Sequence, residues 1–506
     1  IFSNKRNRNE PPIPIIKENS MEKKDLKPAG VFKYFEEICQ VPRPSKKEEK
    51  IIAYLKAFGA KHNLETKVDE AGNVLIKKPA TPGKENLQTV VLQSHIDMVC
   101  EKNNDVQHDF LTDPIETEID GEWLKAKGTT LGADNGIGVA TELAILADDS
   151  IGHGPLECLF TVDEETGLTG AFELKEGFMS GDILLNLDSE DEGEIFIGCA
   201  GGIDSVAEFA YKEVEVPAGY FFFKVEVKGL KGGHSGGDIH LGRGNANKIL
   251  NRFLSRMANR QDLYLCEING GNLRNAIPRE AYAICAVPED AKHDVRTELN
   301  IFTSEVENEL SVTEPDLKLV LESETPRKTA IDQDTTARLL KALYAAPHGV
   351  YAMSQDIPGL VETSTNLASV KMKPNHIIRI ETSQRSSILS ARNDMANTVR
   401  AVFQLAGANV TFGEGYPGWK PNPHSAILEV AAESYKRLFG VDAKVKAIHA
   451  GLECGLFLDK YPTLDMISFG PTLTGVHSPD ERMHIPSVEK FWKHLLDILA
   501  HVPAKK

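Results

Sequence analysis

Apolar residues along the chain fall into short continuous runs and longer stretches, and the two kinds alternate from about residue 31 to residue 210. The short runs have the length and apolar content of buried strands. They lie at 89–92, 156–162 and 183–187. The longer stretches, at 48–62 and 136–147, have the length of helices. Strands that alternate with helices predict an α/β fold with a mostly parallel sheet.

A different pattern begins near residue 213. The segment PAGYFFFKVEVKGL indicates an aromatic and β-branched strand, and a Gly/His-rich loop and a helix at 245–257 follow it. The stretch up to 397 mixes strands with helices and lacks the acidic loop clusters of the first part. Beyond it, a helix at 425–438 and a strand at 465–469 restore the earlier pattern.

This change of pattern predicts an inserted domain. A chain of 506 residues is too long for one hydrophobic core, and two domains are expected. We predict an inserted α+β domain at 213–397, within a first domain formed by 30–212 and 398–506. Residues 1–29 are expected to be a disordered leader or an expression remnant. The first twenty residues are polar, basic and proline-rich, and they lack the apolar core of a secretory signal.

The insert contains a weak sign of internal duplication. The helical segments NANKILNRFLSRM, at 245–257, and TTARLLKALYAAP, at 335–347, each precede an Asn-containing turn and a strand. The match lies in the order of the elements and not in residue identity. Duplication and chance similarity between two α/β units are therefore equal alternatives.

Composition and charge narrow the possible partners. No apolar run approaches ~20 residues, so no membrane span is expected. The net charge of −17 argues against nucleic acid or an anionic membrane as the main partner. Seven cysteines without a C-x-x-C pair suit reduced thiols in the cytoplasm, and they disfavour a structural zinc held by thiolates.

Acidic residues and histidines follow two of the predicted strands. His95 and Asp97 lie two positions apart after TVVLQ, so in extended backbone they share a face. This pair suits a metal ligand beside an orienting carboxylate, although two solvated residues at a strand end would have the same pattern. Glu164 and Glu165 follow PLECLF. Adjacent carboxylates are usually only solvated, but if one binds a cation the other is free to act as a base.

Three further candidates complete this pattern. Asp134 lies in the Gly-rich segment GTTLGADNGIGVA, which has neither G-x-G-x-x-G spacing nor a P-loop lysine. Its carboxylate repels phosphate, so a metal ligand is favoured over a simple helix N-cap. Asp188 and His477 follow the strands DILLNL and DMISF. Because α/β sheets place sites at the carboxyl ends of strands, these oxygen and imidazole donors predict zinc, with manganese or cobalt as substitutes.

The motifs SHIDMV, GADNG, DEETG, NLDSED and VHSPDE occur in this order. They resemble those of the co-catalytic zinc peptidases grouped with aminoacylase and carboxypeptidase G, above all the aminoacyl-histidine, carnosinase-like dipeptidases of that family. The resemblance runs from about residue 30 to the C-terminus. It implies a zinc-peptidase catalytic domain with the insert as a lid, and hydrolysis of aminoacyl-histidine dipeptides by a cytoplasmic monomer or homodimer.

The resemblance implies a site with two zinc ions. His95 and Asp188 would hold one ion, and Glu165 and His477 would hold the other. Asp134 would bridge the two ions, and a cis peptide bond would follow it.

Other residues gain their roles by the same resemblance. Asp97 would orient His95, and Glu164 would be the general base on the water between the metals. His234, in KGGHSGGDIH, would stabilise the oxyanion, although the loop alone indicates a surface histidine.

Three further residues are candidates for binding substrate. Asn275, in GGNLRNAIP, resembles a lid asparagine that touches substrate. Arg385, in IETSQRSS, would clamp the terminal carboxylate, although a surface arginine is nearly as good an interpretation of its local sequence. Glu453, in HAGLECGLF, is a candidate for binding the substrate amine.

Two alternative functions remain open. An N-acyl amino acid deacylase or aminoacylase would use the same metal motifs, because these motifs do not recognise the acyl group. A non-catalytic peptide-binding protein of this fold is the other alternative, but it would have no use for an unligated base at Glu164. The long insert and the GLECG segment favour a dipeptidase.

Overall fold

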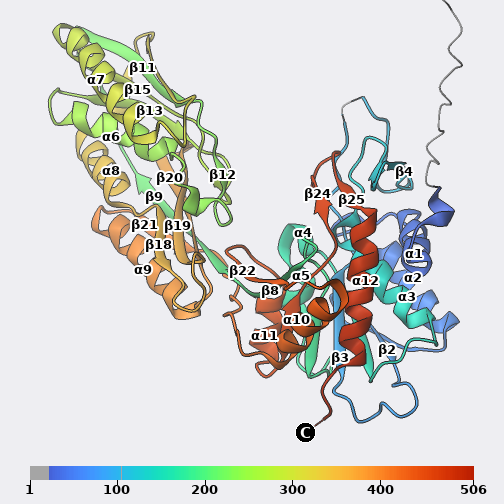
Figure 1. The fold of residues 1–506 in the computed structure, drawn as a ribbon. Helices are drawn as coiled ribbons and strands as arrows, with labels where there is room; N and C mark the ends of the chain where they lie inside the picture. The colour runs from blue at the N-terminus through green and yellow to red at the C-terminus, as the bar shows by residue number, and fades with distance from the viewer. Residues whose placement is uncertain (1–21, 104, 506) are drawn as a thin grey trace, which may run out of the picture.

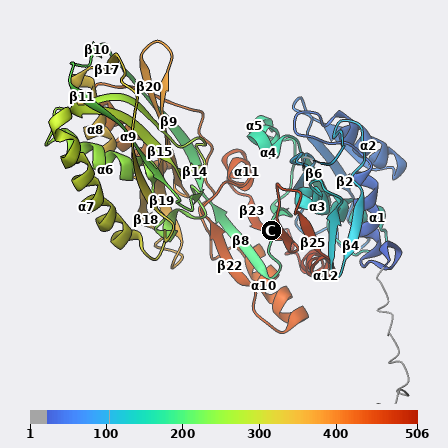
Figure 2. The same cartoon turned by 90° about the horizontal axis from the view of Figure 1, so that it is seen from above.

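The computed structural model describes residues 22–103 and 105–505, which form two units, each built around a large sheet (Figures 1 and 2). The first unit contains an eight-stranded sheet in the order β1-β2-β6-β3-β7-β23-β8-β22. Its strands are β1 (Glu65–Val68), β2 (Val74–Lys78), β3 (Val90–His95), β6 (Leu156–Thr161), β7 (Ile183–Asn186), β8 (Glu194–Cys199), β22 (Lys444–Ile448) and β23 (Asp465–Ser468). The neighbours β6, β3, β7 and β23 run parallel, so their carboxyl ends meet at one edge. The predicted α/β class and mostly parallel central strands are confirmed.

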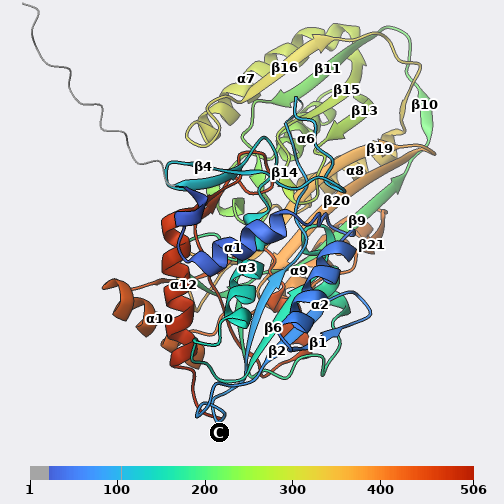
Figure 3. The same cartoon turned by 90° about the vertical axis from the view of Figure 1, so that its right-hand side faces the viewer.

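Helices cover both faces of this sheet, and Figure 3 shows α1, α2 and α3 on the face turned to the viewer. Val90 and Leu92 of β3 pack into a large core with α1, α2, α3, α10 and α12, whereas Val91 packs into a smaller core with α5 and α11. This alternation follows from the two-residue period of a strand. The helices are α1 (Ala29–Cys39), α2 (Glu49–Lys61), α3 (Ala133–Ala147), α4 (Glu164–Gly167), α5 (Thr169–Glu173), α10 (Ala426–Phe439), α11 (Cys454–Lys460) and α12 (Ile485–Ala500). The helices and strands predicted for this unit are therefore present within a few residues.

A small antiparallel sheet lies beside the first unit's main sheet. Its strands are β4 (Thr117–Asp120), β5 (Trp123–Ala126), β24 (Leu473–Thr474) and β25 (Arg482–His484). It brings the C-terminal segment that carries His477 next to residues from the N-terminal half of the chain.

The second unit is built on a nine-stranded antiparallel sheet that is wider than the predicted insert. Its strands are β9 (Gly201–Ala210), β11 (Tyr220–Lys228), β13 (Tyr264–Gly270), β15 (Ala281–Pro288), β16 (Lys318–Ser323), β18 (Gly349–Met353), β19 (Val361–Lys373), β20 (Ile377–Ser386) and β21 (Asn409–Phe412). Both β9 and β21 pair inside this sheet, so the unit spans 201–412, and the predicted boundaries at 213 and 397 are too narrow. The helices lie along the sheet (Figure 1), and their apolar side chains share one hydrophobic core with it. They are α6 (Ala246–Ala258), α7 (Lys292–Leu310), α8 (Gln333–Ala345) and α9 (Leu389–Leu405).

The topology of this unit supports the internal duplication. Apart from β18 and the two-residue strands, one half has the chain order β11-α6-β13-β15-α7-β16 and the other has β9-α8-β19-β20-α9-β21, so both contain a βαββαβ unit. Across the sheet the order is β16-β11-β15-β13 and then β19-β20-β9-β21, which is the same arrangement mirrored about the β13–β19 seam. The first half is inserted into the second between β9 and α8. The short strands β10 (Glu213–Glu215) and β17 (Thr329–Ile331) pair at the two ends of the insertion.

Two neighbouring segments cross between the units. Cys199 and Trp419 exchange backbone hydrogen bonds of 2.9 Å in both directions. Next to them, Gly202 donates to the Tyr416 carbonyl at 3.1 Å, and Tyr416 donates to the Gly202 carbonyl at 2.9 Å. The connection between the units is therefore a short pair of hydrogen-bonded segments.

The predicted leader ends earlier than expected. Residues 1–21 lie outside the described part of the chain, but the short 3₁₀ helix η1 (Lys23–Asp25) leads into Leu26, which is 2% exposed. Leu26 packs in the first unit's core, so 22–29 belong to that unit. Within the described residues, no helix combines the length and the apolar character needed to cross a membrane.

Candidate metal and substrate site

The candidate ligands meet at the carboxyl edge of the first sheet. His95 is the last residue of β3, Glu165 lies in α4 just after β6, and Asp188 lies two residues after β7. Asp134 lies in the first turn of α3, and His477 lies in the loop between β24 and β25. The parallel strands explain why residues so far apart in sequence lie together.

Distances within this cluster divide it into two sets that share one carboxylate. His95 Nε2 lies 3.1 Å from Asp134 Oδ1 and 3.3 Å from Asp188 Oδ1. His477 Nε2 lies 3.2 Å from Asp134 Oδ2 and 3.0 Å from Glu165 Oε2. The two oxygens of Asp134 therefore face different histidines, as a bridging carboxylate would. The peptide bond between Asp134 and Asn135 is cis, as the resemblance implied.

Asp97 connects the candidate ligand His95 to the loop that carries the glutamates. Its Oδ1 lies 3.3 Å from His95 Nδ1 and accepts the Glu164 backbone N–H at 3.0 Å. Its Oδ2 accepts the Glu165 backbone N–H at 3.2 Å and the Ser45 hydroxyl at 2.8 Å. One buried carboxylate thus fixes both His95 and the N-terminus of α4.

Two buried residues that sequence reasoning missed hold the Asp134 loop. The Glu481 carboxylate is 2% exposed and accepts backbone N–H groups from four consecutive residues, 131–134, at 2.7–3.3 Å. The Arg43 guanidinium donates to the carbonyls of Ile96, Asp97 and Gly132. Glu481 lies within VHSPDE, but a short motif gives no sign that it contacts a loop about 350 positions away.

Glu164 and Glu453 are carboxyl groups near the ligands but outside both sets. Burial raises the pKa of Glu164 well above its usual range, and nearby Asp188, Glu453 and Glu165 raise it further. Burial also raises the pKa of Glu453 to about 8. Glu453 is 1% exposed, and its Oε2 accepts from Gln93 Nε2 at 2.6 Å and Thr161 Oγ1 at 2.9 Å. Its predicted contact with a substrate amine stays a prediction.

His234 lies in β12 (Gly233–His234) of the second unit. Its Nδ1 accepts the backbone N–H groups of Gly236 at 3.3 Å and Gly237 at 3.0 Å, which leaves Nε2 as the protonated nitrogen. Burial and the charge of Arg385 lower its pKa to about 4. His234 is therefore a neutral hydrogen-bond donor. Among the described residues, the hydrogen bonds of its imidazole ring join it only to its own loop.

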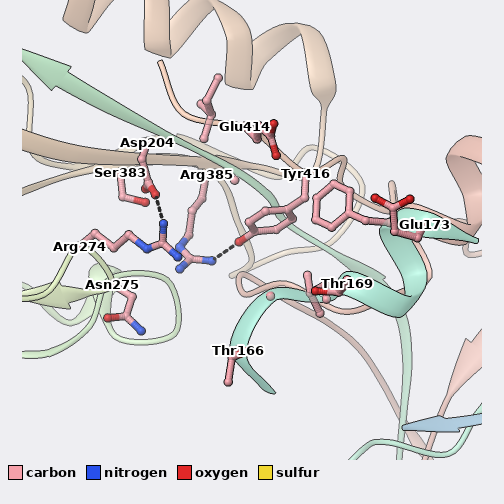
Figure 4. A pocket seen from close by; sticks show the side chains of 15 residues that line it. Thr166, Thr169, Glu173, Asp204, Arg274, Asn275, Ser383, Arg385, Glu414 and Tyr416 are labelled. Atoms are coloured by element: carbon pink, nitrogen blue, oxygen red, sulfur yellow. Dashed lines mark hydrogen bonds and ion pairs between the residues drawn. The ribbon is translucent and has the colours of Figure 1, made fainter. Parts of the chain in front are cut away.

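A cavity of about 500 Å³ lies between the two units. Thr166 to Thr169, Phe172 and Glu173 line it from the first unit. From the second unit and the crossing segment, the lining includes Asp204, Arg274, Asn275, Arg385 and Tyr416 (Figure 4). The predicted substrate residues Asn275 and Arg385 thus lie together on a cavity that begins directly after the glutamate pair.

Comparison with known proteins identifies the family. Residues 91–501 match the model of peptidase family M20/M25/M40. The chain belongs to this family. It is 47% identical to the cytosol non-specific dipeptidase of Escherichia coli (strain K12) over 484 residues, which are 96% of this chain and all of that protein.

Solved structures of other peptidases agree in fold. The crystal structure of aminoacylhistidine dipeptidase from Vibrio alginolyticus superposes with a TM-score of 0.89 at 46% identity, covering 96% of this chain and 99% of that one. Aminopeptidase PepT from Bacillus cereus shares the fold alone, with a TM-score of 0.59 at 16% identity, covering 94% of this chain and 99% of that one. This M20 chain is thus a hydrolase acting on peptide bonds.

The donor set at the carboxyl edge suits divalent cations. Donor atoms of His95, Asp134 and Glu165 lie within 4.8 Å of one another, and the buried Glu165 Oε1 has no hydrogen-bond partner among the described residues. Asp134 and Glu165 raise the pKa of His477 to about 11, so the carboxylates attract positive charge strongly. Imidazole and carboxylate ligands without thiolate are those of catalytic zinc, manganese or cobalt sites.

Proposed function

We propose that the chain is a dipeptidase that works with two divalent metal ions, zinc being the first choice. The observation that carries this proposal is the position of Asp134, whose two oxygens face two separate histidine–carboxylate sets. His95 and Asp188 would hold one ion, and His477 and Glu165 would hold the other. When bound, such a pair lowers the pKa of a water and polarises the scissile carbonyl.

The remaining groups supply proton transfer and orientation. Glu164, outside both ligand sets, takes a proton from the attacking water and delivers it to the leaving amine. Asp97 keeps the ring of His95 in its orientation. His234 presents a neutral Nε2–H, which suits stabilisation of the tetrahedral oxyanion once the second unit closes as a lid.

We propose that the site binds both ends of a dipeptide. Arg385 binds the terminal carboxylate, Asn275 contacts the peptide, and Glu453 is the candidate for the free amine. The names of the two relatives, a non-specific dipeptidase and an aminoacylhistidine dipeptidase, support dipeptides as substrates. Aminoacyl-histidine dipeptides remain our preferred class, and the cytosolic relative supports a cytoplasmic location.

We also propose that His234 acts within its own chain. The first half of the second unit carries His234 and Asn275, while the second half carries Arg385, and both halves belong to one continuous sheet. A monomer would then hold a complete site, although a homodimer with two complete sites fits equally well.

A substrate panel tests the proposal. Purified protein is treated with a chelator and reloaded with zinc. It is then assayed on β-alanyl-histidine, glycyl-histidine, other dipeptides, tripeptides and N-acetyl amino acids. We expect metal-dependent hydrolysis of the dipeptides and poor hydrolysis of the tripeptides. Faster hydrolysis of N-acetyl amino acids would instead establish the deacylase alternative, and zinc binding without any hydrolysis would indicate a binding protein.

A further inference from the structure

Two arginines reach the cavity, and their surroundings differ (Figure 4). Arg274 pairs with the Asp204 carboxylate at 2.9 Å, so its charge is already balanced. Arg385 is 7% exposed, and its described partners are neutral: Nη1 donates to Tyr416 Oη at 2.8 Å, and Nε lies 3.4 Å from Ser235 Oγ. A buried cation without a carboxylate partner is suited to an anionic group of a ligand.

Tyr416 is itself held on several sides. Its backbone exchanges two hydrogen bonds with Gly202, and Arg392 donates to its carbonyl. Its ring lies against glycines of both units: a Cβ at Gly202 would lie 2.6–2.7 Å from ring atoms, and a Cβ at Gly451 would lie 3.0 Å away. The phenol hydroxyl thus has a position fixed by the segments that cross between the units.

We propose that Tyr416 is a positioning residue for recognition of the substrate's terminal carboxylate. Its hydroxyl holds one arm of the Arg385 guanidinium and so orients the donors that remain for the substrate. Two-pronged binding of a carboxylate depends on the orientation of the planar guanidinium, so a freely rotating Arg385 binds more weakly. Tyr416 lies on a segment that crosses between the units, whereas Arg385 lies in β20 of the second unit. The orientation of the Arg385 guanidinium therefore depends on how the second unit is placed relative to that segment. The inference rests on the proposed role of Arg385.

The test compares Tyr416→Phe with the wild type on one dipeptide offered as the free acid and as the C-terminal amide. We expect KM for the free acid to rise roughly five- to tenfold, about the net contribution of one typical hydrogen bond, with kcat little changed. Hydrolysis of the amide should be unaffected. Tyr282→Phe is the matched control, since it removes a phenol hydroxyl bonded to Glu267 elsewhere in the second unit.

A double-mutant cycle separates this inference from the proposed function. In the Arg385→Ala background, Tyr416→Phe should have no further effect on the ratio of free-acid to amide hydrolysis. If Arg385→Ala does not change that ratio, the proposed role of Arg385 fails, and the inference fails with it. If Arg385→Ala changes the ratio but Tyr416→Phe does not, only the inference is overturned. An equal loss on acid and amide would also overturn it, because that pattern indicates a structural effect of Tyr416.

Discussion

Removing the Glu481 carboxylate should loosen the loop that presents Asp134. Four backbone N–H groups converge on this buried side chain, and Glu481→Ala would leave all four without their acceptor. Because water enters the space only partly, we expect a loss of about 3–5 kcal/mol in the free energy of unfolding. Glu481→Gln keeps the shape of the side chain but turns an NH2 group towards some of the backbone N–H donors. We therefore expect it to lower the free energy of unfolding by about half as much as Glu481→Ala.

The effect on metal binding is the more specific measurement. Residues that orient metal ligands typically change metal affinity by roughly 10- to 100-fold when replaced. We expect Glu481→Gln to weaken zinc binding within this range in a competition titration against a chromogenic chelator. Urea unfolding of the metal-free protein gives the stability change separately. Glu489→Gln is the control, since Glu489 is a surface residue paired with Lys493 on α12. Zinc affinity within twofold of wild type and an unchanged unfolding midpoint would refute the reasoning about the loop.

Three further predictions concern the site and the second unit. Glu164→Gln should retain both metals and lose ~100-fold or more in kcat, whereas Glu165→Ala should bind one metal more weakly; metal analysis showing the reverse would exchange the two roles. If His234 acts within its own chain, mixing His234→Ala chains with Glu164→Gln chains under conditions that exchange subunits should restore no activity, and recovery would place the histidine in the partner's site. Burial and nearby Lys248 lower the pKa of His348 to about 4 from 6.5, so the unfolded state takes up a proton first as pH falls. Stability should therefore decrease between about pH 6.5 and 4, by up to roughly 2–3 kcal/mol, and His348→Gln should reduce this pH dependence in urea titrations.

The elements and the positions of several candidate ligands were predictable because both depend on local sequence. A run such as VVLQSH is apolar up to its end and then polar, and parallel strands bring such ends together. For this reason the sequence placed His95, Glu165 and Asp188 correctly at the ends of parallel strands, whereas Asp134 lies at the start of α3 and His477 lies between β24 and β25. The boundaries of the second unit were not predictable, because β9 begins only two residues after the last residue of β8, with no linker between them. Only its pairing with β20, some 170 residues later, assigns it to the other sheet.

Contacts between distant single residues could not be predicted either. Arg43, Glu481 and Tyr416 each lie in a segment without periodicity, and their partners lie tens to hundreds of positions away. Arg43 and Glu481 are polar and buried, and Tyr416 is half-buried, combinations that a sequence does not reveal. The resemblance supplied roles for residues in motifs, but it gave no reason to connect Tyr416 with Arg385.

The insertion of one βαββαβ half inside the other has a consequence for how the protein behaves on dilution. Two separate chains that built a common surface from such halves would lose it as they dissociated. Here the halves are linked covalently by chain segments that pair at β10 and β17, so each half experiences the other at a high effective concentration. The specific activity per chain should then be the same at nanomolar and micromolar protein, whatever the chain's tendency to self-associate.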